Sequence, residues 1–523
     1  MTHPDIGART AGRRIGLLAL ALAVAGAVLL PLMRPLLPVD ETRYLTVAWE
    51  MHRDGTYLVP HLNGAIYGHK PPLLFWLINL VWAVTGVSEA AARWVAPAFG
   101  ALSVALTWRL GNRLFPEREG LGARAALVLA TTGVFALYGS LTMFDTMLTS
   151  ATLLGVLALL WMDDGGGWRA VGLLGLTLAF GVLAKGPVIL VHLFPLALTR
   201  PLWTRATEDR GRWYLSLLAG IGIALGLLSL WLGPALLLGG AEYRAEVLWR
   251  QSAGRMVNAF DHARPVWFFV AALPLMLWPW AWRVSALRGL GSPGLWQDRR
   301  ARILAIWGLS TLALFSMISA KQLHYLLPAL PAVAIALAAA PAPRPGRGAP
   351  LAAAMVIVPV LVWAVLLATG RARLGGQPVT TMGMPGLALS LALGIAGLAL
   401  LAVAGRRAPL IGWALVTPVS LLVMHVALMK PLDEHFDTTR FATELTRAPH
   451  AGVAVDGFRY QGEFGFTARL LAPVDEIAPG GLDAWAQAHP GGLIISTQPT
   501  DPGFPKVGEG FLEGKLVRLY RLP

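Results

Sequence analysis

A polar segment near the N-terminus, residues 38–72, carries residue types that could do chemistry. It holds the adjacent carboxylates Asp40 and Glu41 and, further along, Lys70 in front of two prolines. A carboxylate can orient or deprotonate the acceptor of a group-transfer reaction. A lysine ammonium is a compact point charge that pairs well with a phosphate. The segment therefore predicts part of a site that handles an anionic substrate.

Each of these residues also has a structural interpretation. Asp40 precedes a helical spacing of apolar residues, so it could instead cap that helix. Lys70 could be an anchor whose ammonium reaches the lipid headgroups. Neighbouring residues on a helix point about 100° apart, so the two carboxylates cannot face one point. Both are catalytic candidates, and we expect Asp40 to enter the site and Glu41 to make local bonds.

Polar residues at the ends of later apolar runs could complete such a site. Asp145 lies in a tight turn between two runs, where it could serve catalysis or cap the next helix. Lys185 precedes Gly-Pro, which opens the backbone so that its side chain can face a cavity. The chain has 37 Arg and six Lys, and all three Lys before residue 430 lie beside a helix end on one predicted side. The remaining candidates are Tyr44, His69, Arg255, Lys321, His324 and Tyr325.

The sequence predicts no cofactor and no defined metal site. The histidines that flank the apolar runs lack an HExxH or comparable ligand spacing, and interfacial histidines usually form hydrogen bonds. They are His61, His69, His262 and His324. A divalent cation would be compatible with the acidic run 433–435, although a solvated junction is the preferred interpretation there. The absence of cysteine excludes disulfides, thiolate nucleophiles and Cys-ligated metals.

The composition identifies the elements that must position these residues. Of 523 residues, 56% are hydrophobic and only 14% are charged, and the mean hydropathy is +0.60. Soluble domains average roughly 25% charged residues, so a soluble enzyme and a disordered chain are both excluded. Basic cytoplasmic loops explain the net charge of +14 better than nucleic acid binding does. The composition therefore predicts a polytopic membrane protein.

Thirteen apolar runs predict membrane-spanning helices in an all-α domain over residues 1–429. The first run, 15–33, continues past a cleavage-like Ala-Val-Ala, which favours a retained anchor over a cleaved signal peptide. The other runs lie near 91–108, 125–140, 146–162, 168–184, 186–199, 213–238, 265–282, 303–320, 322–340, 350–369, 385–404 and 409–429.

The distribution of positive charge predicts the topology. The run 73–87 is short and interrupted by Asn79, which favours an interfacial helix in a first outer loop, residues 34–90. In that arrangement, 21 Arg and Lys before residue 430 lie on the cytoplasmic side and 13 on the outer side. If 73–87 crossed the membrane, the bias would reverse. We therefore expect a cytoplasmic N-terminus and a site that faces outward.

A change of composition after Met429 predicts a second domain. Residues 430–523 are polar and contain Gly/Pro turns between short β-rich runs. We expect a small α/β domain on the outer side, with strands at 452–455, 493–497 and 516–522 and helices at 436–446 and 482–488.

The order of the motifs resembles that of the lipid A aminoarabinose transferases, which are related to the protein O-mannosyltransferases within the GT-C glycosyltransferases (families 39 and 83). The specific match is Asp-Glu-Thr-Arg-Tyr at 40–44, Pro-His-Leu-Asn-Gly at 60–64 and Lys-Pro-Pro-Leu at 70–73. Weaker matches follow in order at Arg93, Phe144-Asp145, 184–187, Gly254-Arg255 and 325–328. The resemblance covers essentially the whole chain and implies a GT-C membrane domain of about thirteen helices with a periplasmic C-terminal domain.

The resemblance also implies a reaction at the periplasmic face of the bacterial inner membrane. A sugar would pass from a polyprenyl phosphate to lipid A, another glycolipid, a glycan or a protein, in one step that inverts the anomeric carbon. Asp40 would position or activate the acceptor, with Asp145 beside it. The groups that would bind the departing phosphate are Lys70, Lys185, Arg255 and Tyr325. The other groups expected to line the cavity are Tyr44, His69, Lys321 and His324. A monomer is expected, with membrane lipids and no nucleic acid as partners.

One departure limits what the resemblance implies. The aminoarabinose transferases usually have Glu-Lys-Pro-Pro, whereas this chain has His69 before Lys70. We therefore do not predict that the transferred sugar is aminoarabinose. A transporter or flippase for lipid-linked sugars is the alternative, although it should show internal repeats or charge at the membrane midplane. A membrane scaffold would not need the converging cations.

Reporter fusions test the predicted topology. A fusion after Thr500 should give a periplasmic signal and a fusion after Arg118 a cytoplasmic one, because the run 73–87 stays outside the membrane. A periplasmic signal at Arg118, or a cytoplasmic signal at Thr500, would mean that 73–87 crosses and that the topology is wrong.

Overall fold

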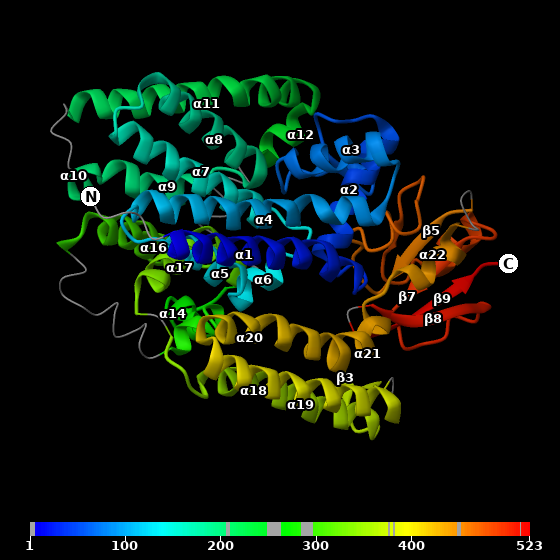
Figure 1. Ribbon diagram of the computed structural model, residues 1–523. Coiled ribbons are helices and arrows are strands. Elements are labelled where there is room, and N and C mark those ends of the chain that lie inside the picture. Colours follow the sequence, from blue (N-terminus) through cyan, green and yellow to red (C-terminus); the bar gives the residue numbers. More distant parts are fainter. Residues whose placement is uncertain are drawn as a thin grey trace.

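The protein is a helical bundle with a small sheet domain at one end (Figure 1). The computed structural model describes residues 6–523 except 205–209, 248–262, 284–296, 342, 375–376, 380–381, 447–450 and 513. Every predicted membrane run coincides with one or more helices. In the described part of the chain, nine helices are long and apolar enough to cross a membrane. They are α1 (Ile6–Leu32), α4 (Glu89–Leu114), α7 (Asp145–Asp163), α8 (Gly167–Lys185), α11 (Arg210–Leu238), α16 (Arg299–Met317), α18 (Gly348–Ala368), α19 (Met384–Arg407) and α20 (Pro409–Met424) with its continuation.

The other four predicted runs form shorter or broken helices. Prolines or helix-ending turns interrupt them, so the crossing of the membrane by these runs stays a prediction. They are α5 (Leu121–Ala130) with α6 (Gly133–Tyr138), α9 (Ile189–Leu198), α14 (Phe268–Met276) with η2 (Trp280–Trp282), and η4 (Leu323–Ala329) with α17 (Leu330–Ala339). Short connecting helices are α10 (Arg200–Trp203) and α12 (Gly240–Ala245).

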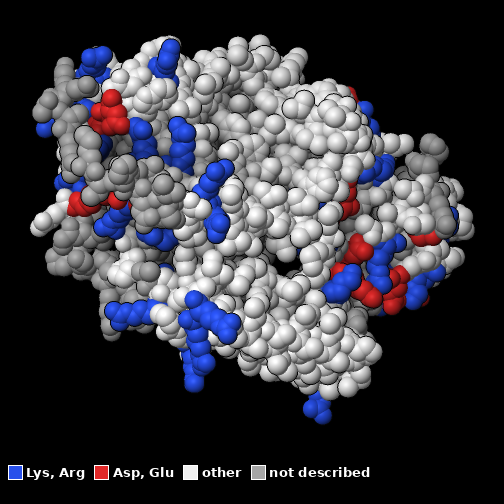
Figure 2. All heavy atoms as spheres, in the orientation of Figure 1, with Lys and Arg blue, Asp and Glu red and all other residues white. Residues whose placement is uncertain are grey.

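On the face shown in Figure 2, charged residues gather toward the two ends of the molecule, with a broad band of uncharged residues between them. At the end away from the sheet domain, residues predicted to share the cytoplasmic side meet in ion pairs. Asp163 accepts from Arg200 at 2.7 Å and from Arg299 at 2.5 Å, and Asp164 accepts from Arg113 at 2.5 Å. These contacts join four segments that the distribution of positive charge assigns to one side.

The first loop folds into helix α2 (Asp40–Asp54), a hairpin of β1 (His61–Leu62) and β2 (Ala65–Ile66), and helix α3 (Leu73–Thr85). Helix α3 has 13 residues, which rise about 20 Å. That length falls short of the roughly 30 Å hydrocarbon core of a bilayer. Its length and its packing against α2 and α4 therefore agree with the interfacial helix predicted for 73–87.

The C-terminal domain holds a five-stranded mixed sheet with one helix against each face. The strand order is β6-β5-β7-β9-β8, in which β5 is parallel to β6 and β7, and β9 is antiparallel to β7 and β8. One face packs on Phe441 of α22 and the other on Trp485 of α23. The elements are α22 (Thr439–Thr446), β5 (Val453–Asp456), β6 (Asp475–Ile477), α23 (Leu482–Ala488), β7 (Leu493–Ser496), β8 (Lys506–Leu512) and β9 (Lys515–Arg521). Short elements connect the remaining parts of the chain. The chain enters the C-terminal domain from α20 through η5 (His425–Met429), α21 (Lys430–Leu432) and η6 (Asp433–His435). A small hairpin of β3 (Arg373–Leu374) and β4 (Gln377–Pro378) joins α18 to α19.

The C-terminal domain is bonded directly to the first loop. The hydroxyl of Thr46 in α2 donates to the Gly462 carbonyl at 2.8 Å and accepts from the Phe466 N–H at 3.0 Å. The Asn63 amide donates to the Val474 carbonyl at 2.8 Å and accepts from its N–H at 2.6 Å. The first loop and residues 430–523 thus lie on the same side of the bundle, as the predicted topology requires.

Candidate active site

Asp40 stands at the first turn of α2 with its carboxylate held in place. The preceding N-cap position is Val39, and no side-chain oxygen caps the helix, so the capping interpretation of Asp40 is wrong. Instead the Tyr44 hydroxyl donates to Asp40 Oδ1 at 2.9 Å. Burial, and then the negative charge of Asp40, raise the pKa of Tyr44 well above its usual value, so its hydroxyl stays a neutral donor. One carboxylate oxygen of Asp40 is therefore fixed by a hydrogen bond one helical turn away.

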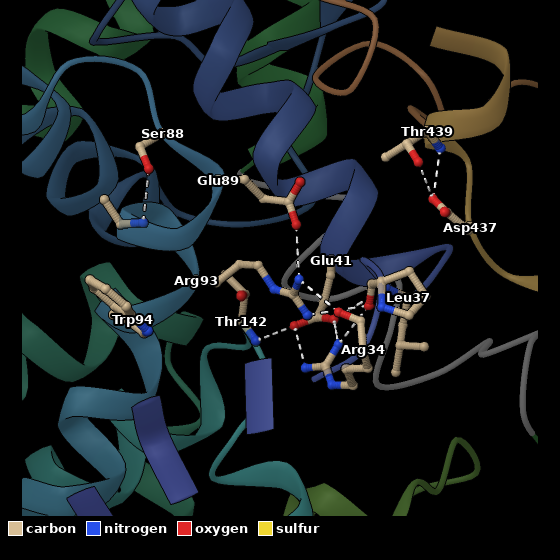
Figure 3. A network of polar contacts seen from close by, with 12 residues as sticks. Arg34, Leu37, Glu41, Ser88, Glu89, Arg93, Trp94, Thr142, Asp437 and Thr439 are labelled. Carbon is tan, nitrogen blue, oxygen red and sulfur yellow. Dashed lines mark hydrogen bonds and ion pairs between the residues drawn. The ribbon is translucent and has the colours of Figure 1, made fainter. Parts of the chain in front are cut away.

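Glu41 points into a separate network that closes around the end of α1 (Figure 3). Its carboxylate forms an ion pair with Arg34 and accepts from the backbone N–H groups of Leu37 at 3.2 Å and Thr142 at 2.8 Å. Arg93 joins the network by donating to the Arg34 carbonyl at 3.0 Å. Burial alone would raise the pKa of Glu41, but the charge and hydrogen bond of Arg34 outweigh it and lower that pKa. Glu41 therefore makes local bonds that position α2. We no longer consider it a catalytic candidate.

Asp145 forms the centre of a cluster of polar groups beside the first loop, which we call the mouth of the bundle. It begins α7, where Phe144 occupies the N-cap position and no side chain caps the helix, so its capping interpretation is also wrong. Its carboxylate forms an ion pair with Lys185 at the end of α8, and its Oδ2 lies 4.0 Å from His324 Nε2. Asp145 is 2% exposed. Three elements, α7, α8 and η4, therefore meet at one buried carboxylate.

Aromatic rings connect this buried pair to Lys70 and Asp40. Lys185 Nζ lies 5.0 Å from the centre of the Tyr325 ring, and Lys70 Nζ lies 5.8 Å from that of Phe144. Phe144 also meets the ring of Tyr44 edge to face, with 4.8 Å between the ring centres. The ammonium groups of both lysines thus stand over rings at the same mouth.

Electrostatic interactions with His324 indicate which of the predicted site residues lie close together. The charges of four residues all act on His324. They are Asp40, Lys70, Asp145 and Lys185. Asp40 and His324 are 284 residues apart in the chain. With Asp145, Lys185 and Lys70, they come from the first loop, α7, α8 and η4. They form a cluster that combines a partly exposed carboxylate, Asp40, and a buried one, Asp145, with the cations Lys70 and Lys185.

Lys321 takes a different position from the one expected. It is buried, and its ammonium donates to the Arg264 carbonyl at 2.9 Å and to the Ile318 carbonyl. These bonds tie the end of α16 to the neighbouring segment. We therefore treat Lys321 as a structural residue rather than a group that lines the substrate cavity.

The His69 side chain is exposed and has a carboxylate beside it. His69 Nε2 lies 3.7 Å from Glu246 Oε1, and a Cβ built on Gly68 would come within 2.3 Å of Glu246 Cγ. Gly68 therefore lets Glu246 approach the loop. Glu246, which directly follows α12, thus places a carboxylate beside His69, the position at which the aminoarabinose transferases usually have a glutamate.

Other predicted residues fall outside the described part of the chain. They are Arg255 and His262. The described residues contain no cluster of three or more metal-ligating side chains.

The sequence interpretation missed two residues that shape the site. Arg34 directly follows the first span, and its position seven residues before Glu41 was the signal that could have identified their pairing. Glu246 has no such signal, because its partner His69 lies in a distant loop.

The sequence of this chain is similar to those of known glycosyltransferases. Residues 69–225 match the family described as Dolichyl-phosphate-mannose-protein mannosyltransferase. The chain is 30% identical over 345 residues to an undecaprenyl phosphate-alpha-4-amino-4-deoxy-L-arabinose arabinosyl transferase 1 of Pseudomonas fluorescens, covering 62% of this chain and 57% of that protein. It is 33% identical over 309 residues to an undecaprenyl phosphate-alpha-4-amino-4-deoxy-L-arabinose arabinosyl transferase of Pseudomonas aeruginosa. That match covers 56% of this chain and 54% of that protein. The chain thus spans a little over half the length of the curated relatives it matches.

The fold matches over nearly the whole chain. The crystal structure of ArnT from Cupriavidus metallidurans bound to undecaprenyl phosphate superposes with a TM-score of 0.74 at 17% identity, covering 97% of this chain and 98% of that one. The GT-C fold expected from the sequence is thereby confirmed. The resemblance to polyprenyl-phosphate-sugar-dependent glycosyltransferases is confirmed by the family and sequence matches.

Removing the charge of Glu41 should destabilise the protein without touching the reacting groups. At pH 7, Glu41→Gln should lower the free energy of unfolding by about 3–5 kcal/mol, because Arg34 loses its buried partner. The pKa of Glu41 is lowered on folding, so its contribution is complete above the unfolded pKa of about 4.3 and is lost as pH falls through the folded value. Unfolding in detergent from pH 7 to pH 3 should therefore show the difference between variant and wild type shrinking.

The matched control is Glu117→Gln, which breaks an ion pair away from this network, with side chains that are 51% exposed for Glu117 and 29% exposed for Arg300. That change should cost less than about 1 kcal/mol. Equal losses in the two variants, or a difference that does not depend on pH, would contradict the role assigned to Glu41.

Proposed function

We propose that this protein is an integral membrane glycosyltransferase that transfers a sugar from undecaprenyl phosphate to an acceptor of the bacterial cell envelope. The observation that carries the proposal is the buried Asp145–Lys185 pair with Lys70 and Asp40 around the same mouth. Two ammonium groups suit a phosphate leaving group, and a carboxylate suits an acceptor. The relatives named above, which use an undecaprenyl phosphate sugar by their names, support the same donor.

The leaving phosphate would be stabilised by the cations. As the bond between the anomeric carbon and the phosphate oxygen breaks, that oxygen keeps the electron pair and gains negative charge. Lys70 and Lys185 offset this charge, and the Tyr325 hydroxyl adds a hydrogen bond. Asp145 holds the Lys185 ammonium in position before the donor arrives, so little reorganisation is needed. Arg255 stays a predicted fourth donor group.

Asp40 would act on the acceptor. Tyr44 occupies Oδ1 of its carboxylate, which leaves Oδ2 to take the proton of an attacking hydroxyl while the acceptor oxygen bonds to the anomeric carbon. Attack opposite the leaving phosphate in one step inverts the anomeric configuration. An acceptor phosphate would already be anionic, and Asp40 would then position it instead of deprotonating it.

The proposed location is the bacterial inner membrane with the site facing the periplasm. Its supports are the 21 against 13 distribution of Arg and Lys and the shared side of the first loop and the C-terminal domain. Under this proposal, residues 1–429 form the catalytic membrane domain and 430–523 a periplasmic domain. The acceptor class is lipid A, another glycolipid, a glycan or a protein. The alternative of a flippase has no support, because the named relatives are transferases.

Two substitutions separate the donor and acceptor roles in a transfer assay with a polyprenyl phosphate sugar. Lys70→Ala should abolish turnover, because the leaving phosphate loses a cation. Asp40→Asn keeps the shape of the side chain and removes its charge, so it should retain donor binding and lose at least about tenfold in rate, and about 10²–10⁴-fold if the acceptor is a hydroxyl.

Lys430→Ala is the matched control, because this lysine has a 70% exposed side chain outside the cluster and should keep full activity. Transfer at the wild-type rate in Lys70→Ala would reduce Lys70 to a lipid anchor. Full activity in Asp40→Asn would remove the role proposed for that carboxylate.

A further inference from the structure

A cavity lies at the end of the bundle away from the C-terminal domain. Its volume is about 360 Å³, and it lies between Trp282 and Arg283 at the end of η2, the loop before α18 and the first turns of α18 and α20. This is the side that the positive charges assign to the cytoplasm. The cluster around Asp145 lies on the other side, because Asp145 begins α7 and Asp163, which pairs with Arg200 and Arg299, ends it. Residues that line it include Trp282, Arg283, Arg344, Leu351, Met355 and Trp413.

The cavity wall contains a buried cation whose bonding is incomplete. Arg283 is 6% exposed, and one of its terminal nitrogens donates to the Pro341 carbonyl at 2.5 Å. Its Nε has no hydrogen-bond partner among the described residues, and no carboxylate of the described residues forms an ion pair with it. Burial lowers the pKa of Arg283 to about 10. A buried guanidinium in this state is stabilised by an anion that enters the cavity.

The rest of the lining is amphipathic. Arg344 is exposed at the rim and adds a second positive charge. Leu351 and Met355, one helical turn apart on α18, are 64% and 59% exposed and continue the wall as an apolar surface. An inorganic anion would use the two arginines and leave this surface unused. A molecule with a phosphate head and acyl chains would use both.

We propose that this cavity binds the phosphate headgroup of an anionic phospholipid from the cytoplasmic leaflet, with Arg283 and Arg344 on the phosphate and acyl chains along α18. Basic pockets between membrane helices on the cytoplasmic side are suited to such headgroups. The site uses none of the residues assigned to sugar transfer, so it stands whether or not the proposed function does.

Native mass spectrometry of the full-length protein in detergent tests the site. Wild-type protein should retain phosphatidylglycerol at least tenfold more tightly than phosphatidylcholine with the same chains. Arg344→Gln should lower affinity for phosphatidylglycerol about fivefold, since each basic residue near a headgroup contributes on the order of 1 kcal/mol. Arg283→Gln should lower it further. Leu351→Trp should displace the lipid by filling the cavity while the charge is unchanged, which keeps the test valid if Arg283→Gln does not fold.

Arg407→Gln is the control, because this exposed arginine lies at the same end of the bundle outside the cavity lining. It should leave lipid binding unchanged. Equal retention of both lipids by wild type, or an equal loss in Arg407→Gln and Arg344→Gln, would overturn the proposal in favour of diffuse surface charge. Full displacement of the lipid by millimolar inorganic phosphate would overturn it in favour of a free phosphate site.

Discussion

The arrangement of this protein depends on the buried ion pair between Asp145 and Lys185. The carboxylate comes from the start of α7 and the ammonium from the end of α8, and His324 of η4 stands beside them. A buried charge without a partner is costly, so neither residue can leave the pair without a large loss of free energy. The pair therefore fixes the ends of these segments at one place and keeps a cation ready at the mouth of the bundle.

The same mouth is closed from the other side by the first loop. Glu41 ties α2 to the end of α1 through Arg34 and to the chain before α7 through the Thr142 N–H. Thr46 and Asn63 then tie α2 and the β1–β2 hairpin to the C-terminal domain. As a result, Asp40 belongs to a helix that is held at its first turn by Glu41 and at its middle by Thr46. The C-terminal domain thus supports the position of a catalytic candidate without contributing a reacting group.

Much of this fold could be predicted from the sequence, because apolar runs and positive charge act locally. Each predicted membrane run coincides with helices, and α3 has the short length expected of an interfacial helix. Strands β6 and β8 were missed. The first has three residues, and the second contains two glycines and charged residues that hide its alternation. Their pairing with neighbouring strands, rather than their own pattern, makes them strands.

Within the site, residue types were easier to predict than partners. Asp145, Lys185 and His324 were all named, but a separation of 40 residues gave no sign that the first two would pair. The capping interpretations of Asp40 and Asp145 were wrong because other side chains bind their carboxylates. The partner of Asp40 is Tyr44, one turn along the same helix, and the partner of Asp145 is the distant Lys185. Lys321 was placed in the cavity from its position at a helix end. Backbone carbonyls bind its ammonium instead. The spacing of residues along the chain does not determine the direction in which such a side chain points.

The most direct test of the central claim is the coupling energy between Asp145 and Lys185, measured by unfolding of Asp145→Asn, Lys185→Met and the double variant in detergent. If the pair holds the mouth together, each single change should cost about 3–5 kcal/mol, because each leaves a buried group without its partner. The double variant should then be more stable than the sum of the single losses predicts, by about 1–3 kcal/mol. Additive losses would show that the two side chains do not depend on each other, and would contradict the account.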